Sequence, residues 1–145
     1  MSETLKQRIM SILDSQKTGT LATVRNGKPY SRYMDFYHEG LTLYCASNRD
    51  THKVGDLEEN PYVHVLLGYQ GKGLKDSFVE IEGRVIIHDS EEMKQKLWNS
   101  DFEGWFKGPD DPDYVILKIT PEQFRLMNTE SGKPEVYSVE DSDLE

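Results

Sequence analysis

The sequence predicts a mainly β protein: a small barrel of six antiparallel strands with peripheral helices. Six short segments alternate apolar and polar residues, as half-buried strands do, and turn residues join most of them directly. At 145 residues the chain has the length of one domain with a genuine core. A barrel this short buries little surface, and large aromatic residues lie beside its loops, so we also expect a dimer.

The predicted strands follow the chain in order, and most are linked as hairpins. They span residues 18–24, 30–38, 41–47, 62–67, 78–88 and 114–120. Asn26-Gly27 is a strong hairpin signal between the first two strands, because both residues accept the positive φ angles of a type I′ turn. Glu39-Gly40 then turns the chain again, which predicts three consecutive antiparallel strands.

Two or three short helices and one brief helical turn are predicted between or beside the strands. Thr4 and Gln7 have capping-box spacing ahead of a helix with an apolar face, and Ser90 caps a later helix. A third helix begins near Thr51, and residues 121–124 indicate a brief helical turn. We assign residues 1–137 to a single domain and expect the acidic tail, 138–145, to be disordered.

The composition excludes several classes of protein. A net charge of -9 and a pI near 4.9 argue against a nucleic-acid binder and disfavour an anionic membrane surface. A single cysteine, Cys45, excludes an internal disulfide and a multi-cysteine metal site, and its apolar strand predicts a buried thiol. We assign no metal ligand. No apolar run could cross a bilayer and no signal-peptide core is present, so we expect a cytoplasmic protein.

Polar and basic residues gather where the third strand meets the next helix. They are Ser47, Asn48, Arg49, Thr51, His52 and Lys53. A helix start adds free backbone N–H groups and the positive end of the dipole, so an anion such as phosphate could bind there. Alternatively, Asp50 caps the helix and the basic side chains lie in water. Spacing alone leaves both interpretations open.

Two further features have both a structural and a functional interpretation. Arg32 lies among large apolar neighbours on one face of its strand, where it could extend to the sheet edge or reach an anion. Trp98, Trp105 and Phe106 are large aromatic residues beside a loop. Such residues are most often core, but they are also the surfaces on which a ring-shaped ligand stacks.

Four segments together resemble the split-barrel flavin-binding proteins related to pyridoxamine 5′-phosphate oxidase, and within them the general stress protein branch. These segments are 19–23, 32–34, 44–53 and 105–113. The resemblance extends from Leu5 to about Met127. It implies a six-stranded antiparallel split barrel that forms a homodimer, with flavin mononucleotide (FMN) bound in each interface groove.

The resemblance also implies the residues that bind the cofactor. The phosphate would be held by Arg32 and Lys53, by the hydroxyls of Ser47 and Thr51, and by the turn at Asn48 and His52. The backbone of Tyr33 and Met34 would run beside the isoalloxazine ring. Trp105, from the same subunit or its partner, would flank that ring or the substrate space.

The function that this resemblance implies is a flavin-dependent oxidoreductase using a reduced nicotinamide or another small substrate. Phe78 stands where the oxidase itself has glutamine, so we do not expect oxidation of pyridoxamine phosphate. We assign no catalytic residue, because no acid–base dyad is evident. Alternatives are a non-catalytic flavin-binding or redox-responsive stress protein, and a split barrel that binds FAD, a deazaflavin or haem. The histidines that keep haem open are His38, His52, His64 and His88.

Overall fold

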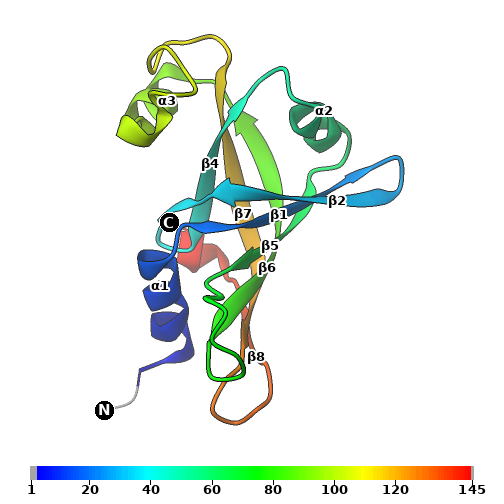
Figure 1. The fold of residues 1–145 in the computed structure, drawn as a ribbon, viewed down its shortest axis with the longest axis vertical. Helices are drawn as coiled ribbons and strands as arrows, with labels where there is room; N and C mark the ends of the chain where they lie inside the picture. The colour runs from blue at the N-terminus through cyan, green and yellow to red at the C-terminus, as the bar shows by residue number, and fades with distance from the viewer. Residues whose placement is uncertain (1–2, 145) are drawn as a thin grey trace.

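The computed structural model describes residues 3–144, which form one antiparallel sheet curled into a half-barrel (Figure 1). Within these residues the strands are β1 (Thr18–Arg25), β2 (Lys28–Asp35), β3 (Tyr37–Glu39), β4 (Thr42–Asn48), β5 (Tyr62–Leu67), β6 (Phe78–His88), β7 (Tyr114–Met127) and β8 (Glu135–Ser138). The helices are α1 (Leu5–Ser15), α2 (His52–Glu59) and α3 (Glu91–Leu97), with 3-10 turns η1 (Ser100–Phe102) and η2 (Asp141–Leu144). The prediction of a mainly β fold with peripheral helices is confirmed.

The sheet has the strand order β2-β1-β5-β6-β7-β4-β3, and β8 pairs with β7. The first hairpin is as predicted, with Asn26 and Gly27 at φ 51° and 76°. The capping box at Thr4 and the cap of α3 by Ser90 are also confirmed. None of the described helices has both the length and the apolar character needed to cross a membrane.

The predicted single strand over residues 30–38 is wrong, because the chain breaks at Phe36. β2 pairs with β1 while β3 pairs with β4, so consecutive strands lie at opposite ends of the sheet order. At the break, the Phe36 amide donates to the Lys17 carbonyl at 2.6 Å, and its ring is 2% exposed. Because Phe36 itself faces the core, apolar and polar residues alternate without interruption from β2 into β3. The periodicity of the sequence therefore did not reveal the break.

The predicted helical turn at residues 121–124 is also wrong. β7 continues through it, with Pro121 opposite Gly83 and Gln123 opposite Glu82, so one extra residue bulges from β7. Proline has no amide to donate to a ladder and is accommodated at such bulges. A Cβ on Gly83 would lie 2.7 Å from the Thr120 carbonyl oxygen, so the close approach of the strands requires glycine there.

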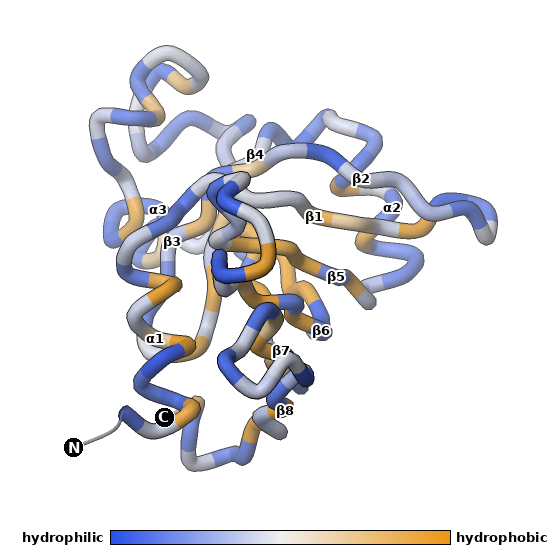
Figure 2. The backbone as a smooth tube through the Cα atoms, turned by 60° about the horizontal axis from the view of Figure 1, so that its bottom comes forward, coloured by the Kyte–Doolittle hydropathy of each residue, from blue (hydrophilic) through white to orange (hydrophobic). Residues whose placement is uncertain are grey.

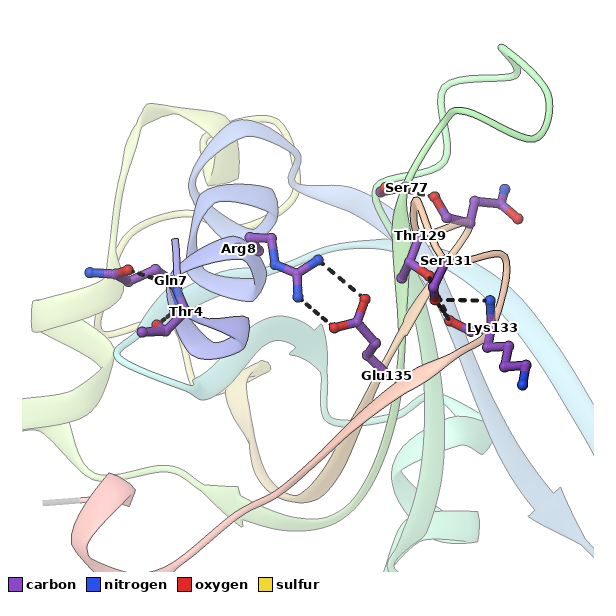
Figure 3. A network of polar contacts seen from close by, with 9 residues as sticks. Thr4, Gln7, Arg8, Ser77, Thr129, Ser131, Lys133 and Glu135 are labelled. Carbon is purple, nitrogen blue, oxygen red and sulfur yellow. Dashed lines mark hydrogen bonds and ion pairs between the residues drawn. The ribbon is translucent and has the colours of Figure 1, made fainter. Parts of the chain in front are cut away.

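The tail predicted to be disordered is folded against α1 as far as Leu144. Asp143 accepts hydrogen bonds from Lys6 Nζ at 2.8 Å and from the Tyr137 hydroxyl at 2.9 Å. Figure 3 shows the neighbouring contact, a forked ion pair in which Arg8 donates to both carboxylate oxygens of Glu135. Basic residues of α1 therefore compensate the acidic tail, and composition alone did not show this pairing. Residue 145 lies outside the described residues.

The apolar side chains form two clusters on opposite faces of the sheet. The larger cluster fills the curl of the sheet and is closed by Ile9 and Leu13 of α1. Figure 2 shows orange, hydrophobic stretches of β5, β6 and β7 in this region. Cys45 is buried in it as predicted, and burial raises the pKa of its thiol. The smaller cluster, around Tyr114 and Phe102, joins β4 and β7 to α3 and η1. It supports one wall of the groove described next.

Candidate functional site

A groove of about 400 Å³ lies between the start of α2 and the segment that follows α3. In Figure 1 these two elements stand at the upper right and upper left of the sheet, with β4 between them. The lining of the groove comes from β1, β2, β3, β4, α2 and η1 and from the residues next to them. The lining residues are Thr18, Tyr33, Met34, Asp35, Tyr37, Ala46, Ser47, Asn48, Thr51, Lys53, Asp101, Phe102, Trp105 and Phe106.

Two half-buried cations stand at one side of this groove. Lys53 lies in the first turn of α2, with Nζ 3.7 Å from Met34 Sδ. Arg32 of β2 donates from Nη1 to Thr23 Oγ1 at 3.0 Å. Within residues 3–144, neither cation forms an ion pair with a carboxylate. Two cations without partners, in a chain with a net charge of -9, form a site that is complementary to an anion.

The pKa values of both cations are lowered, mainly because burial disfavours the charged form. For Lys53, the positive charge of Arg32 lowers the pKa further. For Arg32, the carboxylate of Asp56 acts in the opposite direction. The two side chains are therefore close enough to repel each other, and an anion between them would relieve that repulsion.

Ser47 has the environment of a ligand-binding hydroxyl. Its side chain is 4% exposed and lines the groove, and its Oγ has no hydrogen-bond partner among the described residues. A buried polar atom without a partner costs about 1–3 kcal/mol. The structure thus leaves a buried hydroxyl beside the groove that a ligand oxygen could satisfy.

The start of α2 also lacks a side-chain cap. Thr51 is the N-cap residue, but its Oγ1 donates back to the Asn48 carbonyl at 3.0 Å instead of accepting from the helix. Asn48 Oδ1 accepts from the Asp50 amide at 2.9 Å. The alternative in which Asp50 caps this helix is therefore wrong. The positive end of the helix remains available for an anion.

Aromatic rings form the opposite wall. Phe102 and Phe106 pack against the buried Tyr114, with ring centroids 5.8 Å and 5.0 Å away. Trp98 also packs on Tyr114 and belongs to the core. Trp105 is different, because it lines the groove and yet is 80% exposed. It is the ring of this wall that a ligand could cover.

The structure brings most of the predicted binding residues to one groove. Those that line it are Tyr33, Met34, Ser47, Asn48, Thr51, Lys53 and Trp105. Arg32 does not line the groove, although its charge acts on Lys53, and His52 is exposed on the first turn of α2 and does not line it either. The cofactor roles of these residues remain predictions.

Sequence reasoning missed one part of the groove. Asp101 Oδ2 accepts from Lys17 Nζ at 2.6 Å and from the Tyr37 hydroxyl at 3.0 Å, and Asp35 accepts from Thr18 at 2.8 Å. Lys17 and Asp101 are 84 positions apart. No local spacing could indicate that contact.

Comparison with known proteins identifies the family. A family model described as pyridoxamine 5′-phosphate oxidase matches residues 5–128. The chain belongs to this family. It is similar to general stress protein 26 of Bacillus subtilis (strain 168), with 50% identity over 130 residues, covering 90% of this chain and 93% of that protein. The crystal structure of general stress protein 26 from Bacillus anthracis str. Sterne is 40% identical, covers 93% of this chain and 98% of its own, and has a TM-score of 0.82.

Members of this fold are named for different cofactors. A structure named F420 reductase is 28% identical with a TM-score of 0.64, over 79% of this chain and 93% of its own. A heme binding protein from Mycobacterium smegmatis has a TM-score of 0.80 at 14% identity, over 95% of this chain and 59% of its own. The latter likeness shows the fold alone.

Proposed function

We propose that this protein binds FMN in the groove and acts as a flavin-dependent oxidoreductase of the general stress type. The observation that carries the proposal is the group formed by Arg32, Lys53 and Ser47 at the start of α2. Among residues 3–144, both cations are half-buried and neither forms an ion pair. The Ser47 hydroxyl is buried without a hydrogen-bond partner there, and α2 begins without a side-chain cap. Each of these features favours a phosphate group.

The remainder of the groove fits the ring of the same cofactor. Tyr33 and Met34 lie beside Lys53 on the β2 side, and Trp105 stands on the opposite wall. These side chains offer flat and apolar surface to an isoalloxazine ring. When bound, FMN supplies the hydride and electron transfer, and the protein supplies binding, orientation and electrostatics.

We also propose that two copies associate and complete the groove. Tyr33 and Trp105, both 80% exposed, leave the mouth of the groove apolar and open. Tyr62, Leu66 and Ile86 are further large apolar side chains that are exposed on β5 and β6. A second copy would cover such surfaces, and in a symmetric dimer each groove would receive the same residues from the partner.

The test is a titration of the purified protein with FMN, followed by flavin absorption and fluorescence. We expect saturable binding by the wild type, weakened by Lys53→Ala and by Arg32→Ala. Lys72→Ala and Lys133→Ala are controls, because Lys72 and Lys133 are exposed and do not line the groove. Binding that is unchanged in the two groove variants would overturn the phosphate assignment.

Parallel titrations with FAD, F420 and haem separate the other cofactors. F420 is included because of the reductase at 28% identity, and haem because the fold also occurs in a heme binding protein. Tighter binding of F420 or haem than of FMN would contradict the proposal. Oxidation of reduced nicotinamide by the FMN-loaded protein tests turnover, and bound FMN without turnover would favour a non-catalytic flavin-binding stress protein.

A further inference from the structure

Three side chains from distant parts of the sequence meet at the rim of the groove. Asp101 of η1 accepts through Oδ2 from Lys17 Nζ at 2.6 Å and from the Tyr37 hydroxyl at 3.0 Å. Lys17 lies between α1 and β1, and Tyr37 begins β3. Lys17 Nζ also lies 5.7 Å from the centre of the Tyr37 ring. These contacts lower the pKa of Asp101, chiefly through the hydrogen bond from Lys17. We call Lys17, Tyr37 and Asp101 the rim clamp.

The rim clamp is fixed to rigid parts of the sheet. The Lys17 carbonyl accepts from the Phe36 amide at 2.6 Å, where the chain crosses between the sheet edges. The Tyr37 ring packs edge-on against Phe102, with centroids 5.6 Å apart and an interplanar angle of 89°. The clamp therefore joins the crossing point of the half-barrel to η1.

The backbone connects Asp101 to the exposed tryptophan through one short turn. Asn99 Oδ1 accepts from the Asp101 amide at 2.9 Å. The Phe102 carbonyl, one residue later, accepts from the amides of Trp105 and Phe106 at 2.9 Å and 3.0 Å. Trp105 is 80% exposed, so its own side chain contributes little to holding it in place. Its position depends on the turn, which is tied to the sheet by Phe102 and Phe106 on Tyr114 and, at its start, by the hydrogen bonds of Asp101.

We propose that the rim clamp makes Asp101 a positioning residue that holds Trp105 against the ring end of the groove. This rests on the proposed function, because the ligand ring is that of a flavin. Within residues 3–144, no hydrogen bond or ion pair joins the clamp to Arg32 or Lys53. It should therefore affect the binding of a ring and leave the binding of a phosphate group unchanged.

The experiment compares wild type, Asp101→Asn and Tyr37→Phe, with Glu39→Gln as the matched control. Glu39 forms a similar exposed ion pair, at 2.8 Å with Lys96, but does not line the groove. Hydrogen exchange without ligand follows residues 99–106. Titrations with riboflavin, which carries the ring and its ribityl chain without the phosphate, and with inorganic phosphate measure the two halves of the site separately.

We expect faster exchange of residues 99–106 in Asp101→Asn and in Tyr37→Phe. Riboflavin affinity should fall about fivefold in Asp101→Asn, as expected for the loss of an ion pair that is partly exposed, with phosphate affinity unchanged. Trp105→Ala should cause a similar loss, and adding Asp101→Asn to it should cause little more, because both act through one contact. Glu39→Gln should behave as wild type in these measurements.

Unchanged hydrogen exchange of residues 99–106 in Asp101→Asn would overturn the proposed role of the clamp. An equal loss of riboflavin and phosphate affinity would also overturn it, because it indicates general destabilisation. Full additivity with Trp105→Ala would overturn the route through Trp105. If the wild type binds phosphate but no flavin, the proposed function fails, and the positioning role toward a flavin ring fails with it. The exchange comparison would then still decide whether the clamp holds the turn.

Discussion

The basic residues of α1 and those of the groove have opposite environments in one acidic chain. Lys6 and Arg8 of α1 are paired with Asp143 and Glu135, at 2.8 Å and 2.6 Å. Arg32 and Lys53 are more deeply placed and have no carboxylate partner among residues 3–144, although the chain holds 26 acidic residues. The pairs at α1 fold the tail onto the body. The unpaired cations at the groove are suited to an anion that the chain itself does not supply.

The largest expected effect comes from removing both groove cations. Each charge-assisted hydrogen bond contributes about 1.5–3 kcal/mol, so Arg32→Ala/Lys53→Ala should weaken FMN binding on the order of a hundredfold or more. Isothermal titration calorimetry measures this loss. The matched variant, Lys6→Ala/Arg8→Ala, removes two cations that are already paired and should leave FMN affinity within about twofold. A similar loss in both double variants would contradict the contrast between the two regions.

Ser47→Ala tests the buried hydroxyl in the same way. FMN affinity should fall about tenfold to a hundredfold, because a hydrogen bond to the charged phosphate is lost and such bonds contribute about 1.5–3 kcal/mol. Without ligand, the variant should be at least as stable as wild type, since the removed oxygen has no partner in the described structure. Calorimetric melting with and without FMN separates the two effects. A variant that is less stable without ligand and unchanged in affinity would mean that the hydroxyl has only a structural role.

Lys53→Met tests, in the protein without ligand, whether Lys53 is desolvated and unpaired. The folded state lowers the pKa of Lys53 below its ordinary value of 10.5, so the unfolded chain binds more protons between the two values. Relative to Lys53→Met, the unfolding free energy of wild type should therefore rise with pH up to about 10.5, and Lys53→Met should be the more stable of the two at neutral pH. Urea unfolding at pH 7 and at alkaline pH measures both. A less stable variant at pH 7 would contradict an unpaired, desolvated lysine.

The smallest effect is expected at the ion pair between α1 and Asp143, on the stability of the protein at acidic pH. Hydrogen bonds from Lys6, the Glu140 amide and Tyr137 lower the pKa of Asp143 from 3.8 to about 2. Its stabilising contribution is therefore fully present above about pH 4 and is lost as the pH falls through 2. Asp143→Asn should be less stable than wild type at neutral pH, and the two should converge at pH 2. A stability difference that is independent of pH would show that the Asp143 charge is not involved.

Strand positions were predictable from the sequence where one face of the sheet is buried. β6 has the predicted bounds, Phe78–His88, because its alternating apolar residues all face the core. The errors lie where tertiary contacts override local pattern. Phe36 breaks a strand without breaking its periodicity, and Pro121 lies in a bulge that depends on Gly83 of the neighbouring strand. β8 is stabilised by β7 and α1, which no local signal reveals.

The groove shows the same division between local and distant information. Ser47, Thr51 and Lys53 are neighbours in the sequence, so a helix start that follows a strand was enough to predict a possible anion site. Arg32 could not be resolved from the sequence, because an arginine on a half-buried strand can serve either role. The rim clamp at Asp101 was invisible for another reason, since its partners come from two other elements of the fold.

The most direct test compares FMN with riboflavin, which differs only in lacking the phosphate. Calorimetric titrations of wild type and of Arg32→Ala/Lys53→Ala with both ligands give the contribution of the phosphate in each protein. We predict that wild type strongly prefers FMN and that the double variant binds the two ligands with similar affinity. A wild type without this preference, or a double variant that retains it in full, would contradict the assignment of Arg32 and Lys53 to a phosphate.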